Sequence, residues 1–280
     1  MILSFLTSPI QYTLEYDPIP RFIDALGRLI SDHVYIIKTE TGLLSQILSL
    51  YITILQNCSS LNYCNLVTDT LNELFINIPE IPSDCVTLIP NLIHALVKCS
   101  SFPESLFVSN SQGCDDEDMM HKLRLSCQDV TLSLASSSVG VFTIASSLIS
   151  ITGSIAIQES VLCLFRGIVD SIEESLLSLF VDSPFQDDSL NFRITKRADI
   201  PTTPVVTKYD EILEYVYQHM NEYTVHPILL STALQVMFSF DNWTFSRRDL
   251  CQHLFTYVLS ACSSSPISLL PRLFQYICRL

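Results

Sequence analysis

The sequence predicts an all-α protein of about ten helices, each roughly 12 to 20 residues long. Apolar residues recur at steps of three and four along most of the 280-residue chain, of which 48% is hydrophobic. Short breaks of serine or proline separate these segments, and only 6 glycines are present to form sharp strand turns. A chain of this length and composition can bury a large core.

The remaining helices are organised around a central apolar segment. Residues 130–158 carry no charge, and the segment continues as a helical pattern to residue 180. Its second half places apolar residues on one helical face: Val161, Phe165, Ile168, Ile172, Leu176 and Leu179. Their neighbours are apolar as well, and a helix that is apolar almost all round packs on several sides. We therefore expect a central helical hairpin flanked by other helices.

The segments before the hairpin predict helices that begin near residues 21, 41, 61, 83 and 119. Ser83 is the expected N-cap of the fourth helix, and Pro90 either kinks that helix or lies in its first turns. Residues 34–37 are rich in β-formers and are compatible with a strand, although no partner strand is evident nearby.

Three regions follow from these patterns. Residues 1–182 form a helical-repeat region that contains the central apolar hairpin. Residues 183–208 form a loop or linker, because prolines interrupt a stretch of little periodicity. Residues 209–280 form a C-terminal helical region that packs on the first, with helices expected at 209–223, 227–240, 246–263 and 267–280.

Charge argues against direct binding of nucleic acid. The chain has 29 acidic and 15 basic residues and a net charge of −14, which repels a phosphate backbone. Charged residues make up only 16% of the chain, and the mean hydropathy is +0.36. This balance indicates heavy internal burial, a large partner surface or a membrane.

The cysteines indicate a reducing compartment. Most of the 10 cysteines lie inside apolar helical patterns, where a thiol behaves as a small hydrophobic group. No secretory signal peptide is apparent at the N-terminus, and the chain is longer than typical disulfide-stabilised secreted domains. We expect free thiols and a cytoplasmic or nuclear location.

Two uncharged segments, residues 41–68 and 130–158, are long enough to cross a bilayer. Several serines, glutamines and asparagines interrupt them, and neither basic residues nor aromatic belts frame their ends. Buried helices explain the same composition. A membrane-associated or polytopic helical membrane protein is therefore the second interpretation.

No known catalytic motif is present, so an enzyme of unknown type is the third interpretation. The histidines are scattered, and Cys251 and His253 lie two apart on a helix, where they point to different faces. Cys58 and Cys64 can meet only across a turn, and no second pair completes a tetrahedral metal site. We expect no cofactor, no metal and no small-molecule ligand.

The spacing of the predicted helices gives helix pairs of roughly 40 residues between residues 20 and 180. In this spacing, and in its leucine, isoleucine, valine and serine content, the chain resembles armadillo/HEAT-type α-solenoid proteins. The resemblance implies an irregular stack of helix pairs that acts as an adaptor, with a concave groove that holds a partner segment. It carries over no catalytic residue.

Two groups of residues are candidates for binding a protein partner. The first is an acidic segment that suits a basic partner surface and otherwise is a solvated loop: Asp115, Asp116, Glu117 and Asp118. The second is a C-terminal group of aromatic residues that otherwise belongs to the core: Trp243, Phe245, Phe274 and Tyr276. We therefore predict a non-catalytic scaffold or adaptor subunit that acts through protein–protein interactions, within a larger complex.

Overall fold

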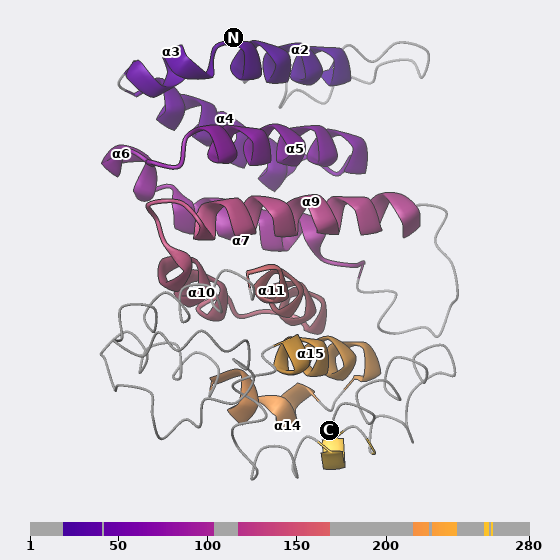
Figure 1. Ribbon diagram of the computed structural model, residues 1–280. Coiled ribbons are helices and arrows are strands. Elements are labelled where there is room, and N and C mark those ends of the chain that lie inside the picture. Colours follow the sequence, from indigo (N-terminus) through magenta and orange to yellow (C-terminus); the bar gives the residue numbers. More distant parts are fainter. Residues whose placement is uncertain are drawn as a thin grey trace, which may run out of the picture. The chain divides into compact units, whose positions relative to one another are not determined.

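The computed structural model describes residues 19–40, 42–103, 117–168, 215–223, 226–239, 255–257 and 259 of the chain. The regular elements in these residues are helices, and no strand occurs among them (Figure 1). The predicted all-α class is confirmed. The helices belong to two compact units that divide between Ile151 and Thr152.

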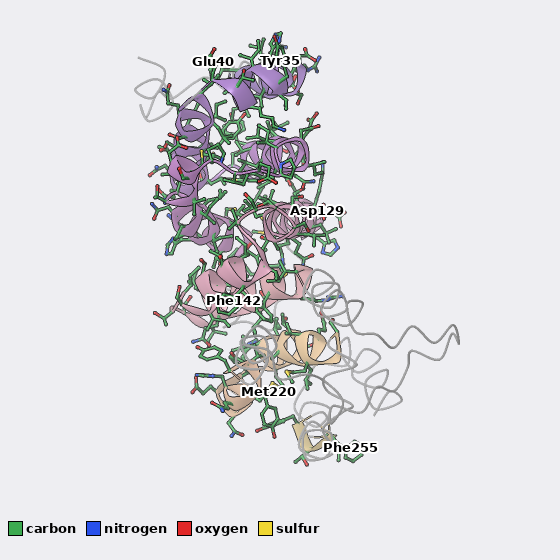
Figure 2. The ribbon with its side chains drawn as sticks, turned by 60° about the vertical axis from the view of Figure 1, so that its left-hand side comes forward. Tyr35, Glu40, Asp129, Phe142, Met220 and Phe255 are labelled. Atoms are coloured by element: carbon green, nitrogen blue, oxygen red, sulfur yellow. The ribbon has the colours of Figure 1, made fainter. Side chains whose placement is uncertain are left out.

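The first unit contains eight described helices, which follow one another along the chain: α2 (Ile19–Asp32), α3 (Val34–Thr39), α4 (Leu43–Asn57), α5 (Leu61–Asn77), α6 (Ser83–Val86), α7 (Ile89–Ser100), α9 (Glu117–Ala135) and α10 (Val141–Ile149). Helices α2, α5 and α9 lie side by side in one layer, and α4 and α7 pack together in a second layer (Figures 1 and 2). Helix α4 also packs on α5, and α7 on α9, so each successive helix pair bridges the two layers.

The apolar periodicity of each helix explains its packing. In α4, the apolar residues Leu44, Leu48, Tyr51 and Leu55 recur at steps of three and four, and all four are buried. Helix α9 buries residues at steps of three and four that are wholly inaccessible: Leu123, Cys127, Val130 and Leu134. Each buried leucine stabilises the fold by about 2 kcal/mol relative to an exposed one. The core therefore lies between the two layers.

A glycine permits the close approach of α2 to α5. A Cβ atom added to Gly27 would lie 2.8 Å from Oγ1 of Thr70 in α5. That hydroxyl donates a hydrogen bond to the carbonyl of Leu66 at 2.9 Å, which fixes its position. A larger residue than glycine at position 27 would therefore separate the two helices or displace Thr70.

Short polar side chains connect the helices of the first layer. Ser31 of α2 donates to Glu73 of α5 at 2.6 Å. Ser126 and Ser133 of α9 donate to Asp69 and Asn72 of α5 at 2.7 and 2.6 Å. A further serine, Ser138, joins two connecting loops, because it bonds the backbone of Pro79 and Ile81 at 2.8 Å each. Two serines of the apolar central segment, Ser133 and Ser138, thus serve as hydrogen-bonding links.

The central segment differs from the predicted hairpin. Residues 130–158 are divided among three helices: the end of α9, the whole of α10, and the start of α11 (Ile155–Gly167). Gly140, with a φ of 80°, is the N-cap of α10, and residues 150–154 separate α10 from α11. The positive φ explains why the first break falls at a glycine. The predicted continuation from residue 169 to residue 180 lies outside the described residues.

These breaks also bear on the two segments considered as bilayer spans. Residues 41–68 are likewise interrupted, by residues 58–60 between α4 and α5. Among the helices that the structure describes, none combines the length and the apolar character needed to cross a membrane.

Two local predictions in the first unit are wrong. Residues 34–37 lie in helix α3, not in a strand, because packing of Ile37 against its helical neighbours decides the conformation where no partner strand exists. Ser83 is the first residue of α6, and Pro82 occupies the N-cap position. Pro90 lies in the first turn of α7, where its missing N–H leaves no helical bond unmade.

The described residues of the second unit contain α11, α14 (Met220–Tyr223), α15 (Pro227–Ser239) and short helical pieces at residues 215–218 and 255–257. Helix α15 confirms the helix predicted at 227–240. Helix α11 packs on α15 through the buried carboxylate of Glu159, which accepts a hydrogen bond of 2.9 Å from Thr232. Residues 183–208 and most of the helices predicted at 246–263 and 267–280 lie outside the described residues.

Candidate protein-binding face

The two groups of binding residues predicted from the sequence fall mostly outside the described part. Glu117 begins α9, and Asp118, the second residue of that helix, is exposed, as expected for acidic side chains at the positive end of a helix. The structure does not describe Asp115 and Asp116, nor the four aromatic residues Trp243, Phe245, Phe274 and Tyr276. Binding by either group stays a prediction.

Charge divides the two layers of the first unit. In α4 and α7 together, Lys98 is the one residue among Asp, Glu, Lys and Arg. Helices α2, α5 and α9 carry the following charged residues: Arg21, Asp24, Arg28, Asp32, Asp69, Glu73, Glu117, Asp118, Lys122, Arg124 and Asp129. The charge of these five helices is therefore concentrated in one layer, and the other layer is almost uncharged.

The outer side of α4 carries a row of small polar residues one helical turn apart. Ser49 donates to the carbonyl of Ser45, Thr53 to that of Ser49, and Asn57 to that of Thr53, each at 2.8 Å. Each of these side chains therefore donates one hydrogen bond to a carbonyl group of its own helix. Ser49, Asn57 and the neighbouring Gln46 are exposed, and Thr53 is half-buried.

Helix α7 continues this surface. Its exposed residues Asn91, His94 and Lys98 recur at steps of three and four. The ammonium group of Lys98 donates to the main-chain carbonyl of Gln56 in the last turn of α4, at 2.8 Å. The one charged side chain of these two helices therefore rests on the negative end of its neighbour. We call the outward-facing polar residues of both helices the α4–α7 face: Gln46, Ser49, Thr53, Asn57, Asn91, His94 and Lys98.

The layer of α2, α5 and α9 has a different surface. Burial, and then the nearby carboxylate of Asp69, raise the pKa of Asp129, which Figure 2 labels on α9. The exposed large apolar residues of these helices are few: Phe22 and Leu29 on α2, Ile76 on α5 and Leu125 on α9. Apolar residues scattered singly among charges are ordinary on protein surfaces.

Inside the first unit, four cysteines from different segments converge. The thiol of Cys64 in α5 contacts the carbonyl of Cys58 at 3.9 Å across the α4–α5 turn. The sulfur atoms of Cys99 in α7 and Cys127 in α9 lie 3.7 Å apart. A hydrogen bond with Cys58, burial, and the Cys99 thiol all raise the pKa of Cys64. Sequence reasoning missed Cys99 and Cys127, because each reads as an ordinary apolar position of its own helix.

The thiol state agrees with the sequence prediction where it is described. Six cysteines are thiols that form no disulfide: Cys58, Cys64, Cys85, Cys99, Cys127 and Cys163. Within the residues that the structure describes, no group of three or more histidine, cysteine, aspartate or glutamate side chains has the geometry to hold a metal ion.

Comparison of the chain with known protein families, with curated proteins and with solved structures finds no match.

Proposed function

We propose that this chain is a non-catalytic scaffold or adaptor subunit, and that the α4–α7 face binds another protein within a larger complex. The observation that carries this proposal is that α4 and α7 have almost no charged residues. The helices with which they pair, α5 and α9, carry several. The fully buried centres of protein interfaces are depleted in charged residues.

The state of the polar groups on this face favours burial by a partner. A polar group that is buried without a hydrogen bond costs about 1 to 3 kcal/mol. The hydroxyl groups of Ser49 and Thr53 and one amide N–H of Asn57 already donate to carbonyl groups of their own helix, so a partner covers these donors without that cost. Lys98 likewise keeps its bond to Gln56. The face is thus polar enough to be stable in water, and four of its side chains already donate hydrogen bonds within the first unit.

The arrangement of the helices supports an irregular armadillo/HEAT-like α-solenoid. The packing of α4 with α5 and of α7 with α9, with like helices side by side in each layer, is the pattern of stacked helix pairs. Proteins of that architecture present one layer as an extended binding surface. The partner that fits the α4–α7 face is a protein segment with small uncharged and aliphatic side chains, such as one side of an amphipathic helix.

Isolation of the tagged protein from cells without detergent, followed by mass spectrometry, tests this function. We expect a stoichiometric complex with one or two other proteins in the soluble fraction. Recovery of the protein only in carbonate-resistant membranes would contradict the proposal and favour the membrane-associated alternative. Recovery as a monomer under all conditions would contradict both.

A further inference from the structure

The contact between Cys99 and Cys127 joins the two layers of the first unit. Cys99 lies in the last turn of α7 and Cys127 in the middle of α9, and their sulfur atoms are 3.7 Å apart. A disulfide bond is about 2.05 Å long, so each sulfur has to move by less than about 1 Å to form one. Rotation about the Cα–Cβ bond of a cysteine moves its sulfur atom by distances of that size.

The two thiols differ in access to solvent. Cys127 is wholly buried, and Cys99 is half-buried near the end of its helix. A dissolved oxidant therefore meets Cys99 first, while Cys127 is held in contact behind it. This is the arrangement of an attacking thiol with a resolving thiol next to it.

Arg124 of α9 contacts the residues at the end of α7. Its guanidinium group, on the turn of α9 before Cys127, donates to the carbonyl of Ser100 at 2.9 Å. The same group stacks over the ring of Phe102, 4.2 Å from its centre. The residues directly after Cys99 are therefore fastened to α9, which keeps the sulfur atoms close.

We propose that Cys99 and Cys127 are a redox-active pair that a hydroperoxide converts to a disulfide between α7 and α9. The sulfur of Cys99 attacks the peroxide, an S–O bond forms, the O–O bond breaks, and one molecule of water leaves (an alcohol, for an alkyl hydroperoxide). The sulfur of Cys127 then attacks that of Cys99, the S–S bond forms, and the hydroxyl leaves as water with the proton of Cys127. Two thiols lose two electrons and two protons, and the peroxide is reduced. The pair does not depend on the proposed protein-binding function.

Oxidation of the purified full-length protein with hydrogen peroxide tests this pair. The reduced protein is freed of reductant, treated with peroxide, blocked with iodoacetamide and mapped by peptide mass spectrometry. We expect a disulfide-linked peptide pair that contains Cys99 and Cys127 and that dithiothreitol separates. Because the link spans 28 positions of the chain, the oxidised protein is also expected to unfold at higher urea concentration than the reduced one.

Two variants sharpen the experiment. Cys99→Ala, at a half-buried site, is expected to abolish both the linked peptides and the effect of peroxide on unfolding. Cys163→Ala, in the second unit, is the control and is expected to leave both unchanged. Peptide mass spectrometry of the oxidised wild-type protein tests the Cys99–Cys127 disulfide even without these variants. Sulfinic or sulfonic acid at Cys99 with Cys127 still reduced, or a disulfide from Cys99 to Cys64 or Cys58 instead, would overturn the proposal.

Discussion

The ammonium group of Lys98 in α7 donates a hydrogen bond of 2.8 Å to the main-chain carbonyl of Gln56 in the last turn of α4. The last carbonyl groups of a helix have no partner within it and carry its partial negative charge. The one charged residue of α4 and α7 therefore serves to join them. Apart from Lys98, the α4–α7 face contains no Asp, Glu, Lys or Arg residue.

Replacement of Lys98 tests this link. Lys98→Met keeps much of the aliphatic side chain and removes the donor and the charge, so we expect a loss of about 1 kcal/mol in the free energy of unfolding. Urea denaturation followed by circular dichroism measures it. Lys122→Met, at an exposed position of α9, is the matched control. Equal stability of the two variants would contradict a role for Lys98 in joining α4 and α7.

The effect of Gly27→Ala on stability is expected to change sign when Thr70 is replaced as well. Gly27→Ala places a methyl group against Oγ1 of Thr70, and overpacking of this kind costs about 1 to 3 kcal/mol. When Thr70→Ala removes that atom first, the same change is expected to stabilise the protein by up to about 1 kcal/mol, since alanine favours a helix more than glycine. A double-mutant cycle measures the coupling. Additive effects would show that α2 does not pack on α5 through this pair.

We expect the ionisation of Tyr51 to lower the stability of the protein in alkaline solution. Burial raises the pKa of its hydroxyl to about 12, an effect that the nearby Thr70 only partly opposes. The unfolded chain loses this proton near pH 10 and the folded chain near pH 12, so the contribution is complete below pH 10 and is lost as the pH rises to 12. The expected decrease is about 3 kcal/mol over that interval.

Urea denaturation at several pH values measures this decrease. Burial also raises the pKa of the Cys85 thiol, to about 11, so the wild-type decrease is expected to begin near pH 9. Tyr51→Phe isolates the tyrosine, because the steepest part of the decrease, between pH 10 and 12, is expected to be smaller in this variant. An identical pH profile in the variant would contradict the burial of an un-ionised Tyr51.

Asp129 is expected to affect the free energy of unfolding between acidic and neutral pH. Its pKa is raised in the folded protein, so its ionisation opposes folding, and stability falls as the pH rises through that value. Asp129→Asn is therefore expected to raise the melting temperature at neutral pH. The difference is expected to vanish near pH 3, where the carboxyl group is largely protonated in both states. A difference that persists at low pH would show that the asparagine acts through packing instead of charge.

Local periodicity predicted the helices but not how they meet. Leu44, Leu48 and Tyr51 recur at steps of three and four, and the structure buries all three, because a row of apolar residues on a helix has to be covered. The strand considered for residues 34–37 was wrong, because β-propensity without a partner strand yields to helical packing.

Contacts between distant segments could not be predicted from the sequence. The contact between Cys99 and Cys127 depends on the packing of α7 on α9, which no local pattern specifies. The α4–α7 face was missed for a similar reason. The absence of charge from residues 41–68 suggested burial or a membrane, whereas Ser49 and Thr53 lie on the outer side of α4 and bond carbonyl groups of their own helix.

Binding of a partner at the α4–α7 face is tested most directly by placing one charge on it. Ser49→Lys adds a lysine to the middle of that face, and Ala25→Lys adds the same charge at an exposed position of α2 in the other layer. Both tagged variants are purified from cells without detergent, and the co-purifying proteins are quantified against wild type. We expect at least about a tenfold loss of the stoichiometric partner with Ser49→Lys, because an unpaired charge in an interface costs more than about 1.4 kcal/mol, and wild-type recovery with Ala25→Lys. Full retention of the partner by Ser49→Lys, with the protein folded, would contradict binding at this face.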